Sequence, residues 1–391
     1  MRRVILCAAL AASLAPALAP PLDAQARQNS GGGRRIARRV LFAGVGAAIG
    51  GLAGTTYVLF RGQEQPGSCG NPTCVLIVTL GSGTLLGYMI GREFDDLHAL
   101  RYRGGAPLHP KDVSIGLSGE PNVLAVRDQL VAVGGNTGVQ LFRSGAGFQA
   151  QPARARGVRG IAALDITPPG ALTLGSLSGL YVYPPVTGRG TLVREGEIMA
   201  TSAATDRVYF AAGARIESAP LTADTARTWP GLTLDSPVRA IRFDASNNIL
   251  WAVTDSALVS LRPTGDSLSV VGRLAMPSGA RRVSAGEGRV AVAFGEGGVR
   301  VMDAANPAAP REISAWTGAR FSYDVALAAG RVFVAAGPEG VYVLEAGEGD
   351  PRVVGLAREL GFAAAIEAEG PYLYILDRRT NALRRISSDF Q

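Results

Sequence analysis

The chain has 391 residues, and its 39 Lys and Arg outnumber its 32 Asp and Glu to give a formal net charge of +7. A basic balance of this size raises nucleic acid and anionic membrane surfaces as partners. Much of the excess lies within the first 39 residues, next to an apolar segment, where basic side chains meet anionic lipid headgroups. The rest of the chain has no basic stripe with interleaved aromatic residues, so we expect no nucleic-acid partner.

The N-terminus has the three regions of a secretory signal peptide. Arg2 and Arg3 precede an apolar run over residues 4–14, and small-residue cleavage sites follow. We predict a signal peptide over residues 1–26, with cleavage after Ala26 favoured and cleavage after Ala19 left open. Residues 27–39 then form a basic segment beside the membrane.

Two uncharged apolar segments follow, at residues 40–60 and 74–91. They have 21 and 18 residues, which suits helices that cross a bilayer. Each carries glycine at every fourth position, and such spacing leaves one helix face without side chains. The glycines are Gly46, Gly50, Gly54, Gly83, Gly87 and Gly91. Glycine is abundant, at 51 of 391 residues, but the phased triplets favour a glycine-zipper transmembrane helical hairpin over residues 40–91. We expect this hairpin to bind membrane lipid, and its glycine faces allow a homo-oligomer.

Two cysteines remain after removal of the signal peptide, and both lie in the turn-rich loop between the apolar segments. An even pair, Cys69 and Cys74, favours a disulfide that pins this loop. A free or metal-bound pair is the alternative. A structural zinc needs four ligands, however, and His98 and His109 lie beyond the second segment in a different region. We therefore predict a disulfide and no metal site, followed by a linker over residues 92–111.

The orientation of the hairpin is ambiguous in the sequence. The basic cluster at residues 34–39 would face the cytoplasm by the positive-inside rule, whereas a cleaved signal peptide places it outside. We give the signal peptide more weight because all three of its regions are present. Residues 112–391 are thus predicted to lie in the periplasm or outside the cell. A cytoplasmic placement is the alternative, and both the inner and the outer membrane stay open.

Residues 112–391 consist of seven repeats. An alternating apolar strand, introduced by Gly or another small residue, returns at steps of 41, 36, 42, 41, 42 and 42 residues. In the fifth unit, four strands are separated by glycine-rich and Asn-Pro turns; we expect them at residues 282–285, 289–294, 299–302 and 311–314. A period of about 40–45 residues filled with short strands predicts an all-β fold, a seven-bladed β-propeller with four-stranded blades.

The seventh repeat lacks a fourth strand, because the chain ends at Gln391. An unassigned strand, residues 112–117, lies just before the first blade. We predict that this N-terminal strand completes the seventh blade and closes the ring, which removes a free sheet edge.

One repeat carries a family resemblance. The stretch from Gly298 to Pro310 has an alternating strand, then Asp303, then the turn Asn306-Pro307. It resembles the LVIVD repeat of bacterial surface and periplasmic propellers, and residues 340–344 match the strand alone. The resemblance implies a propeller and a setting outside the cytoplasm, but no activity. The Trp-Asp ending of WD40 repeats is missing from the chain.

A candidate ligand site lies at the mouth of the predicted channel. The first strands of the blades share one equivalent position, which is occupied by Arg159, Arg239, Arg281 and, in the sixth unit, Tyr323. Converging guanidinium groups offer paired donors to a carboxylate or phosphate. The alternative, which we favour, is that these are ordinary charged strand ends, with Asp165 and Asp324 near enough to neutralise them.

No catalytic constellation accompanies this site. Acid/base catalysis in a propeller would need several His, Asp or Glu residues at the channel, and neither histidine lies in the repeats. We expect no enzyme activity and no cofactor. The predicted function is a membrane-anchored extracytoplasmic platform for protein interaction or ligand binding in the bacterial cell envelope, with an envelope protein as partner. The alternative is a propeller hydrolase or lyase that acts on an anionic substrate at the channel mouth.

Overall fold

The structure is a computed structural model. It describes residues 113–387 except for 153–154, 156, 185–189, 222–227, 346 and 359, together with Ala106–Pro107 and residue 48. The chain divides into Met1–Arg103 and Gly104–Gln391, and all described strands lie in the second unit. The signal peptide, the glycine-zipper residues and the Cys69–Cys74 disulfide fall outside the described residues and stay predictions. Within the residues that are described, no helix is both long and apolar enough to cross a bilayer.

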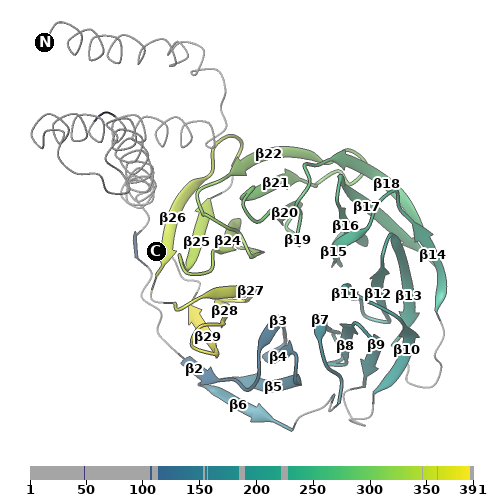
Figure 1. The fold of residues 1–391 in the computed structure, drawn as a ribbon. Helices are drawn as coiled ribbons and strands as arrows, with labels where there is room; N and C mark the ends of the chain where they lie inside the picture. The colour runs from purple at the N-terminus through teal and green to yellow at the C-terminus, as the bar shows by residue number, and fades with distance from the viewer. Residues whose placement is uncertain are drawn as a thin grey trace, which may run out of the picture. The chain divides into compact units, whose positions relative to one another are not determined.

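Seven sheets, each built on four antiparallel strands, form a ring around a central axis, which confirms the predicted all-β seven-bladed propeller (Figure 1). The first strand of each blade lies nearest the axis. From the axis outwards, the first three blades are β3 (Pro121–Arg127), β4 (Leu130–Gly135), β5 (Gly138–Ser144) and β6 (Phe148–Gln151); β7 (Ile161–Ile166), β8 (Leu172–Ser176), β9 (Gly179–Tyr183) and β10 (Thr191–Glu195); and β11 (Ala200–Ala203), β12 (Arg207–Ala212), β13 (Arg215–Pro220) and β14 (Trp229–Thr233). The third blade therefore has four strands, although its repeat is the shortest.

The next three blades follow the same plan. They are β15 (Val238–Asp244), β16 (Ile249–Thr254), β17 (Ala257–Thr264) and β18 (Ser267–Ala275); β19 (Arg282–Gly286), β20 (Arg289–Ala293), β21 (Val299–Asp303) and β22 (Arg311–Trp316); and β23 (Asp324–Ala328), β24 (Arg331–Ala335), β25 (Val341–Glu345) and β26 (Arg352–Ala357). The four strands predicted for the fifth repeat are confirmed, with their ends shifted by at most two residues.

The seventh blade joins the two ends of the described chain. Its strands β27 (Ala363–Glu369), β28 (Tyr372–Asp377) and β29 (Ala382–Ser387) are followed outwards by β2 (Val113–Gly116). The pairing of β2 with β29 is antiparallel, with Ile115 opposite Leu383. This confirms the predicted closure by an N-terminal strand, which gives β29 a partner at its outer edge.

A buried arginine fastens the closed blade to the first one. Arg385 of β29 is 7% exposed, and its guanidinium donates to the Ser144 hydroxyl and the Gly145 carbonyl, each at 2.6 Å. The Tyr374 hydroxyl donates to the same Ser144 oxygen at 3.0 Å. The guanidinium carbon also lies 4.5 Å from the centre of the Tyr372 ring. Blades seven and one are thus tied by charge-assisted hydrogen bonds between side chains and backbone, and by no strand pairing among the described strands.

The sixth blade has one strand more than predicted. Strand β1 (Ala106–Pro107), which lies in the segment expected to be a linker, pairs in parallel with β26 at Gly355 and Leu356. The outer strand of a blade has unpaired backbone groups, and an extended segment beside it satisfies some of them. A proline is tolerated there because β1 has a partner on one side only.

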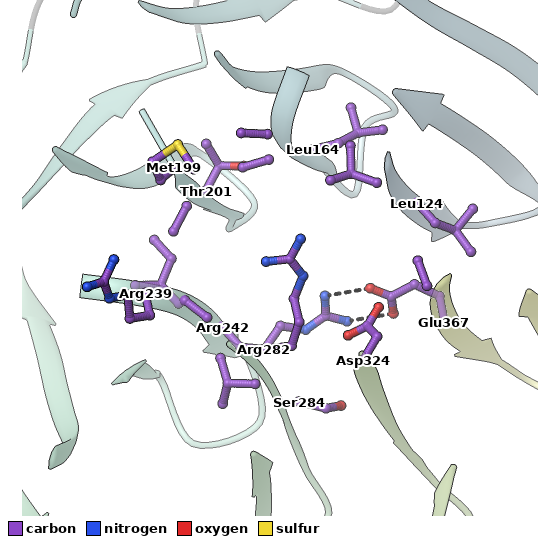
Figure 2. Close-up of a pocket in the computed structure, with 18 of the residues that line it drawn as sticks. Leu124, Leu164, Met199, Thr201, Arg239, Arg242, Arg282, Ser284, Asp324 and Glu367 are labelled. Carbon is purple, nitrogen blue, oxygen red and sulfur yellow. Dashed lines mark hydrogen bonds and ion pairs between the residues drawn. The ribbon is translucent and has the colours of Figure 1, made fainter. Parts of the chain in front are cut away.

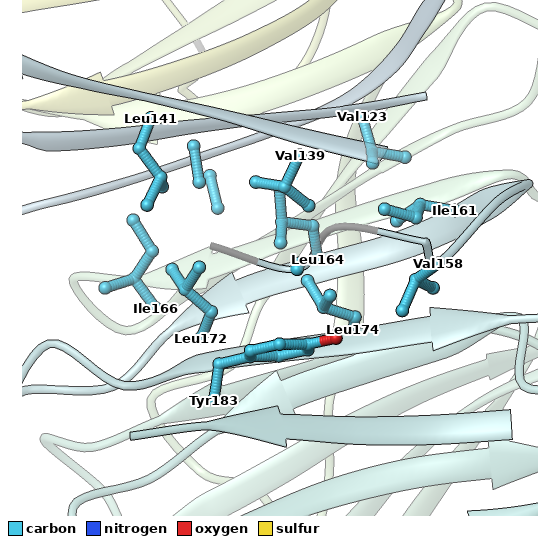
Figure 3. Packing of buried hydrophobic residues seen from close by; sticks show 13 residues of the cluster. Val123, Val139, Leu141, Val158, Ile161, Leu164, Ile166, Leu172, Leu174 and Tyr183 are labelled. Atoms are coloured by element: carbon cyan, nitrogen blue, oxygen red, sulfur yellow. The ribbon is translucent and has the colours of Figure 1, made fainter. Parts of the chain in front are cut away.

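The hydrophobic core is divided among the blade-to-blade interfaces. Between blades one and two, Leu141 and Val139 face Leu164, Leu172 and other buried side chains (Figure 3). The same alternation recurs around the ring because each strand presents every second side chain to a neighbouring blade. Burying an aliphatic side chain of this size contributes about 1.5–3 kcal/mol.

Candidate functional site: the central channel and its entry face

The first strands of all seven blades line a central channel with a hollow of about 90 Å³ (Figure 2). Pockets that bind small molecules usually measure about 300–1,000 Å³. The channel is therefore narrow, and most contacts of its side chains are with one another. We call the end at which the first strands begin the entry face; it carries Arg159, Met199, Arg239, Arg281 and Tyr323.

An ion pair crosses the channel. Arg242 of β15 donates two hydrogen bonds to the carboxylate of Glu367 in β27, at 3.3 and 3.4 Å (Figure 2). The side chains are only 32% and 23% exposed, and these exposed parts face the channel. The pair joins the fourth and seventh blades, which are 125 residues apart in sequence. It therefore braces the ring across its axis.

Enclosure changes the acid–base properties of the channel carboxyls. Burial, reinforced by the nearby Asp324 and Asp165, raises the pKa of Glu367 to about 7, although Arg242 opposes the shift. The negative charge of Glu367 is in turn the main reason why the pKa of Arg242 is raised, so Arg242 stays protonated. Burial also raises the pKa of Asp324, against the opposing charge of Arg282. The channel thus holds permanently charged arginines and a carboxyl that titrates near neutral pH.

Polar side chains of the first strands also bind the backbone of the next blade. The Asp165 carboxylate accepts from the Ala203 N–H at 2.7 Å, and the Asp324 carboxylate accepts from the Ile366 N–H at 3.1 Å. Serine hydroxyls accept in the same way at two other junctions. The Ser202 hydroxyl accepts from the Phe243 N–H, and the Ser284 hydroxyl accepts from the Leu327 N–H. These hydrogen bonds hold neighbouring blades in register.

The structure places the four predicted ligand-binding residues on the entry face, but it gives them different surroundings. Arg239 lines the channel hollow, and its guanidinium pairs with Asp255 at 2.6 and 2.8 Å. The partner that neutralises it is therefore Asp255, and not Asp165 or Asp324. Arg159 is exposed. An anion site shared by the three arginines stays a prediction.

Arg281 and Tyr323 are brought together through a ring that the sequence analysis missed. The guanidinium carbon of Arg281 lies 5.2 Å from the centre of the Phe321 ring, and that ring lies 4.5 Å from Tyr323. Phe362 also packs against Tyr323, with ring centres 4.9 Å apart. A signal was present, because Phe321 stands three residues and Phe362 one residue before a first strand.

The channel ion pair was also missed. Glu367 stands in the strand Ala363–Glu369, which is otherwise rich in alanine, and an enclosed carboxylate in such a strand requires a partner. Opposite charges in first strands of different blades could have indicated the pair. In the described part of the chain, no three His, Cys, Asp or Glu side chains form a group that could hold a metal ion.

Comparisons with known proteins find the fold but no family. No known family model matches the chain, and no curated protein sequence matches it. A solved structure described as the crystal structure of the mitotic checkpoint complex has a TM-score of 0.58 at 11% identity, over 73% of this chain and 98% of that one. The structure of U3-55K has a TM-score of 0.58 at 12% identity, over 72% and 100%. The WD40 β-propeller domain of Doa1 has a TM-score of 0.54 at 12% identity, over 71% and 97%. At these identities the likeness shows the fold alone.

Proposed function

We propose that the protein is an interaction platform of the bacterial cell envelope, whose propeller binds another protein through its entry face. One observation carries this proposal. Arg242 and Glu367 of the channel pair with each other, whereas the entry face exposes large apolar side chains: Leu177 is 65% exposed and Met199 44% exposed. Leu177 lies in the turn between β8 and β9, beside Gly160, and Met199 directly precedes β11. Burial of exposed apolar surface favours protein association, so these two side chains support a docking surface at the mouth of the ring.

The proposed setting rests on the N-terminal sequence. A signal peptide over residues 1–26, a glycine-zipper hairpin over residues 40–91 and a disulfide between Cys69 and Cys74 together favour a membrane-anchored protein outside the cytoplasm. The LVIVD-like stretch from Gly298 to Pro310 supports the same setting. Protease treatment from the periplasmic side should digest the propeller of the full-length protein. Protection until the inner membrane is breached would place the propeller in the cytoplasm instead.

A propeller hydrolase or lyase is the second candidate, and one observation favours it. The pKa of Glu367, about 7, lies where a general base works at neutral pH. Glu367 is bonded to Arg242 inside a hollow of about 90 Å³, however, so a substrate would have to open the channel to reach it. We therefore place a non-enzymatic function first. Hydrolysis of an anionic ester by the wild type that is abolished in E367Q would reverse this order.

The interaction itself can be tested by substitution on the entry face. Proteins crosslinked to the full-length chain in cells should be recovered with the wild type and lost with the Leu177→Asp/Met199→Asp double variant, because a charge replaces each apolar contact. Val270→Asp is the matched control, since Val270 is 51% exposed but lies on the outer strand β18. The proposal fails if no crosslinked protein is recovered, or if the control loses it equally.

A further inference from the structure

Part of the entry face has a distinct composition. Five residues follow one another along the rim, and we call them the rim strip: Arg281, Phe321, Tyr323, Phe362 and Arg379. Arg281, Tyr323 and Phe362 directly precede the first strands of blades five, six and seven, and Phe321 stands two residues before Tyr323. Arg379 lies in the turn between β28 and β29, where its Cβ would be 3.0 Å from a Cβ added at Gly361. The strip thus runs from blade five to blade seven, with an arginine at each end and three rings between.

The three rings are held in place by their neighbours. Gly295 and Gly337 both have φ of 59°, in the left-handed region. A Cβ at Gly295 would lie 2.9 Å from the Phe321 ring, and one at Gly337 would lie 2.6 Å from the Tyr323 ring. These two glycines therefore let the backbone approach the rings closely. The rings are half-buried, so each keeps part of its surface for a ligand while its orientation is set in advance.

The arginines of the strip differ from two arginines of the neighbouring fourth blade, one at the channel mouth and one on the outer strand β18. Arg239 is paired with Asp255, and Arg273 is paired with Asp235. By contrast, Arg281 and Arg379 are exposed and neither forms an ion pair with any residue that the structure describes. Their guanidinium groups are therefore available on the side that carries the rings. An exposed arginine offers planar, paired donors that match a carboxylate.

We infer that the rim strip binds an extended acidic peptide segment of a partner protein. Carboxylates of the segment pair with Arg281 and Arg379, and an apolar side chain between them packs on Tyr323 and its neighbouring rings. Arginine and aromatic residues are the types enriched at the energetic centres of protein interfaces. The distance from Arg281 to Phe362 is at most about 15 Å along the strip, which an extended peptide of about five residues spans. This inference rests on the proposed interaction function and assigns it a ligand chemistry.

A displayed library of random heptapeptides, panned on the full-length protein, tests the inference without knowledge of the natural partner. We expect enrichment of sequences with two acidic residues that flank an apolar one. A dye-labelled enriched peptide should bind the Arg281→Gln/Arg379→Gln double variant about tenfold more weakly or worse, since each substitution removes a charge-assisted pair. Tyr323→Ala should weaken binding as well, because the apolar side chain loses its platform.

The matched control is the Arg311→Gln/Arg352→Gln double variant, which removes two exposed arginines from the outer strands β22 and β26. It should bind the peptide like the wild type. Enriched peptides that lack acidic residues, or that bind the strip variant unchanged, would overturn the inference and leave the platform function standing. An absence of enriched peptides would also overturn the inference. If no crosslinked partner is found either, the inference and the proposed interaction function both fail. Equal displacement of the peptide by single-stranded DNA or anionic vesicles would show a general anion site instead.

Discussion

Replacing Glu367 with Gln tests whether enclosure or the Arg242 ion pair dominates the energetics of the channel. The pKa of Glu367 rises from 4.5 to about 7, chiefly because of burial. A carboxyl with a higher pKa in the folded state binds its proton more tightly there, so its contribution to stability is fully present below the unfolded pKa and is lost as pH rises through the folded one. At 1.36 kcal/mol per pKa unit the loss is about 3 kcal/mol, or about 2 kcal/mol when screening of the side chain's 23% exposed part is allowed for.

The measurement compares thermal unfolding of the two full-length proteins across the pH range. Gln keeps a hydrogen-bond acceptor for Arg242 but does not titrate, so wild type should lose about 2–3 kcal/mol relative to E367Q between about pH 4 and pH 8. For a propeller of this size that is about 4–6 °C in Tm. Glu345→Gln, which removes a carboxylate from an exposed ion pair, is the control. A stability difference between wild type and E367Q that stays constant with pH would refute the reasoning, and so would a wild type that becomes more stable than E367Q as pH rises. In either case Arg242 would offset the effect of burial completely.

Three further substitutions test the closure and the rim. Arg385→Met should lower the free energy of unfolding in urea by about 2–4 kcal/mol, because the buried Ser144 hydroxyl and the neighbouring carbonyl lose their charged donor; a loss below about 0.5 kcal/mol would show that the fastening is dispensable. The Leu117 N–H donates to the Asn381 carbonyl, just before β29. N–H groups alternate in direction along a strand, so the Ile115 N–H also points towards β29 and the Ser114 N–H points away from it. Ile115→Pro should therefore cost about 2 kcal/mol more than Ser114→Pro in the same assay, and equal costs would contradict closure by β2. Gly337→Val should cost about 2–4 kcal/mol, because a left-handed residue acquires a branched side chain against a ring at 2.6 Å; an unchanged urea midpoint would contradict the close approach.

The fold could be predicted from the sequence because its determinants are local and repeated. Each blade needs alternating apolar residues and turn glycines within about 42 residues, and these recur with little change from Leu258 to Leu383. Closure by residues 113–116 was predictable by subtraction, since the last repeat lacked a strand and an unused one preceded the first. Strand β1 was not predictable, because Ala106–Pro107 has no strand pattern and pairs only by lying beside an edge.

The channel was harder to predict because its contacts depend on ring geometry. Arg242 and Glu367 each occupy an unremarkable place in an alternating strand, and only the closed ring brings blades four and seven face to face. Alignment of strand starts found Arg281 and Tyr323, but it could not show that Phe321 lies between them or that Asp255 engages Arg239. Partners far apart in sequence decide which of several equivalent arginines is available, and the repeat pattern carries no information about them.

The central claim is that the entry face is where the propeller meets its partner, and site-specific photo-crosslinking in cells tests it most directly. A photoreactive amino acid would replace Leu177 or Met199 on the entry face, and Asp266 or Ala305 in exposed turns on the opposite face. We predict a discrete crosslinked protein from both entry-face positions and none from the opposite positions. Crosslinks from Asp266 or Ala305 alone, or none from any of the four, would contradict the account.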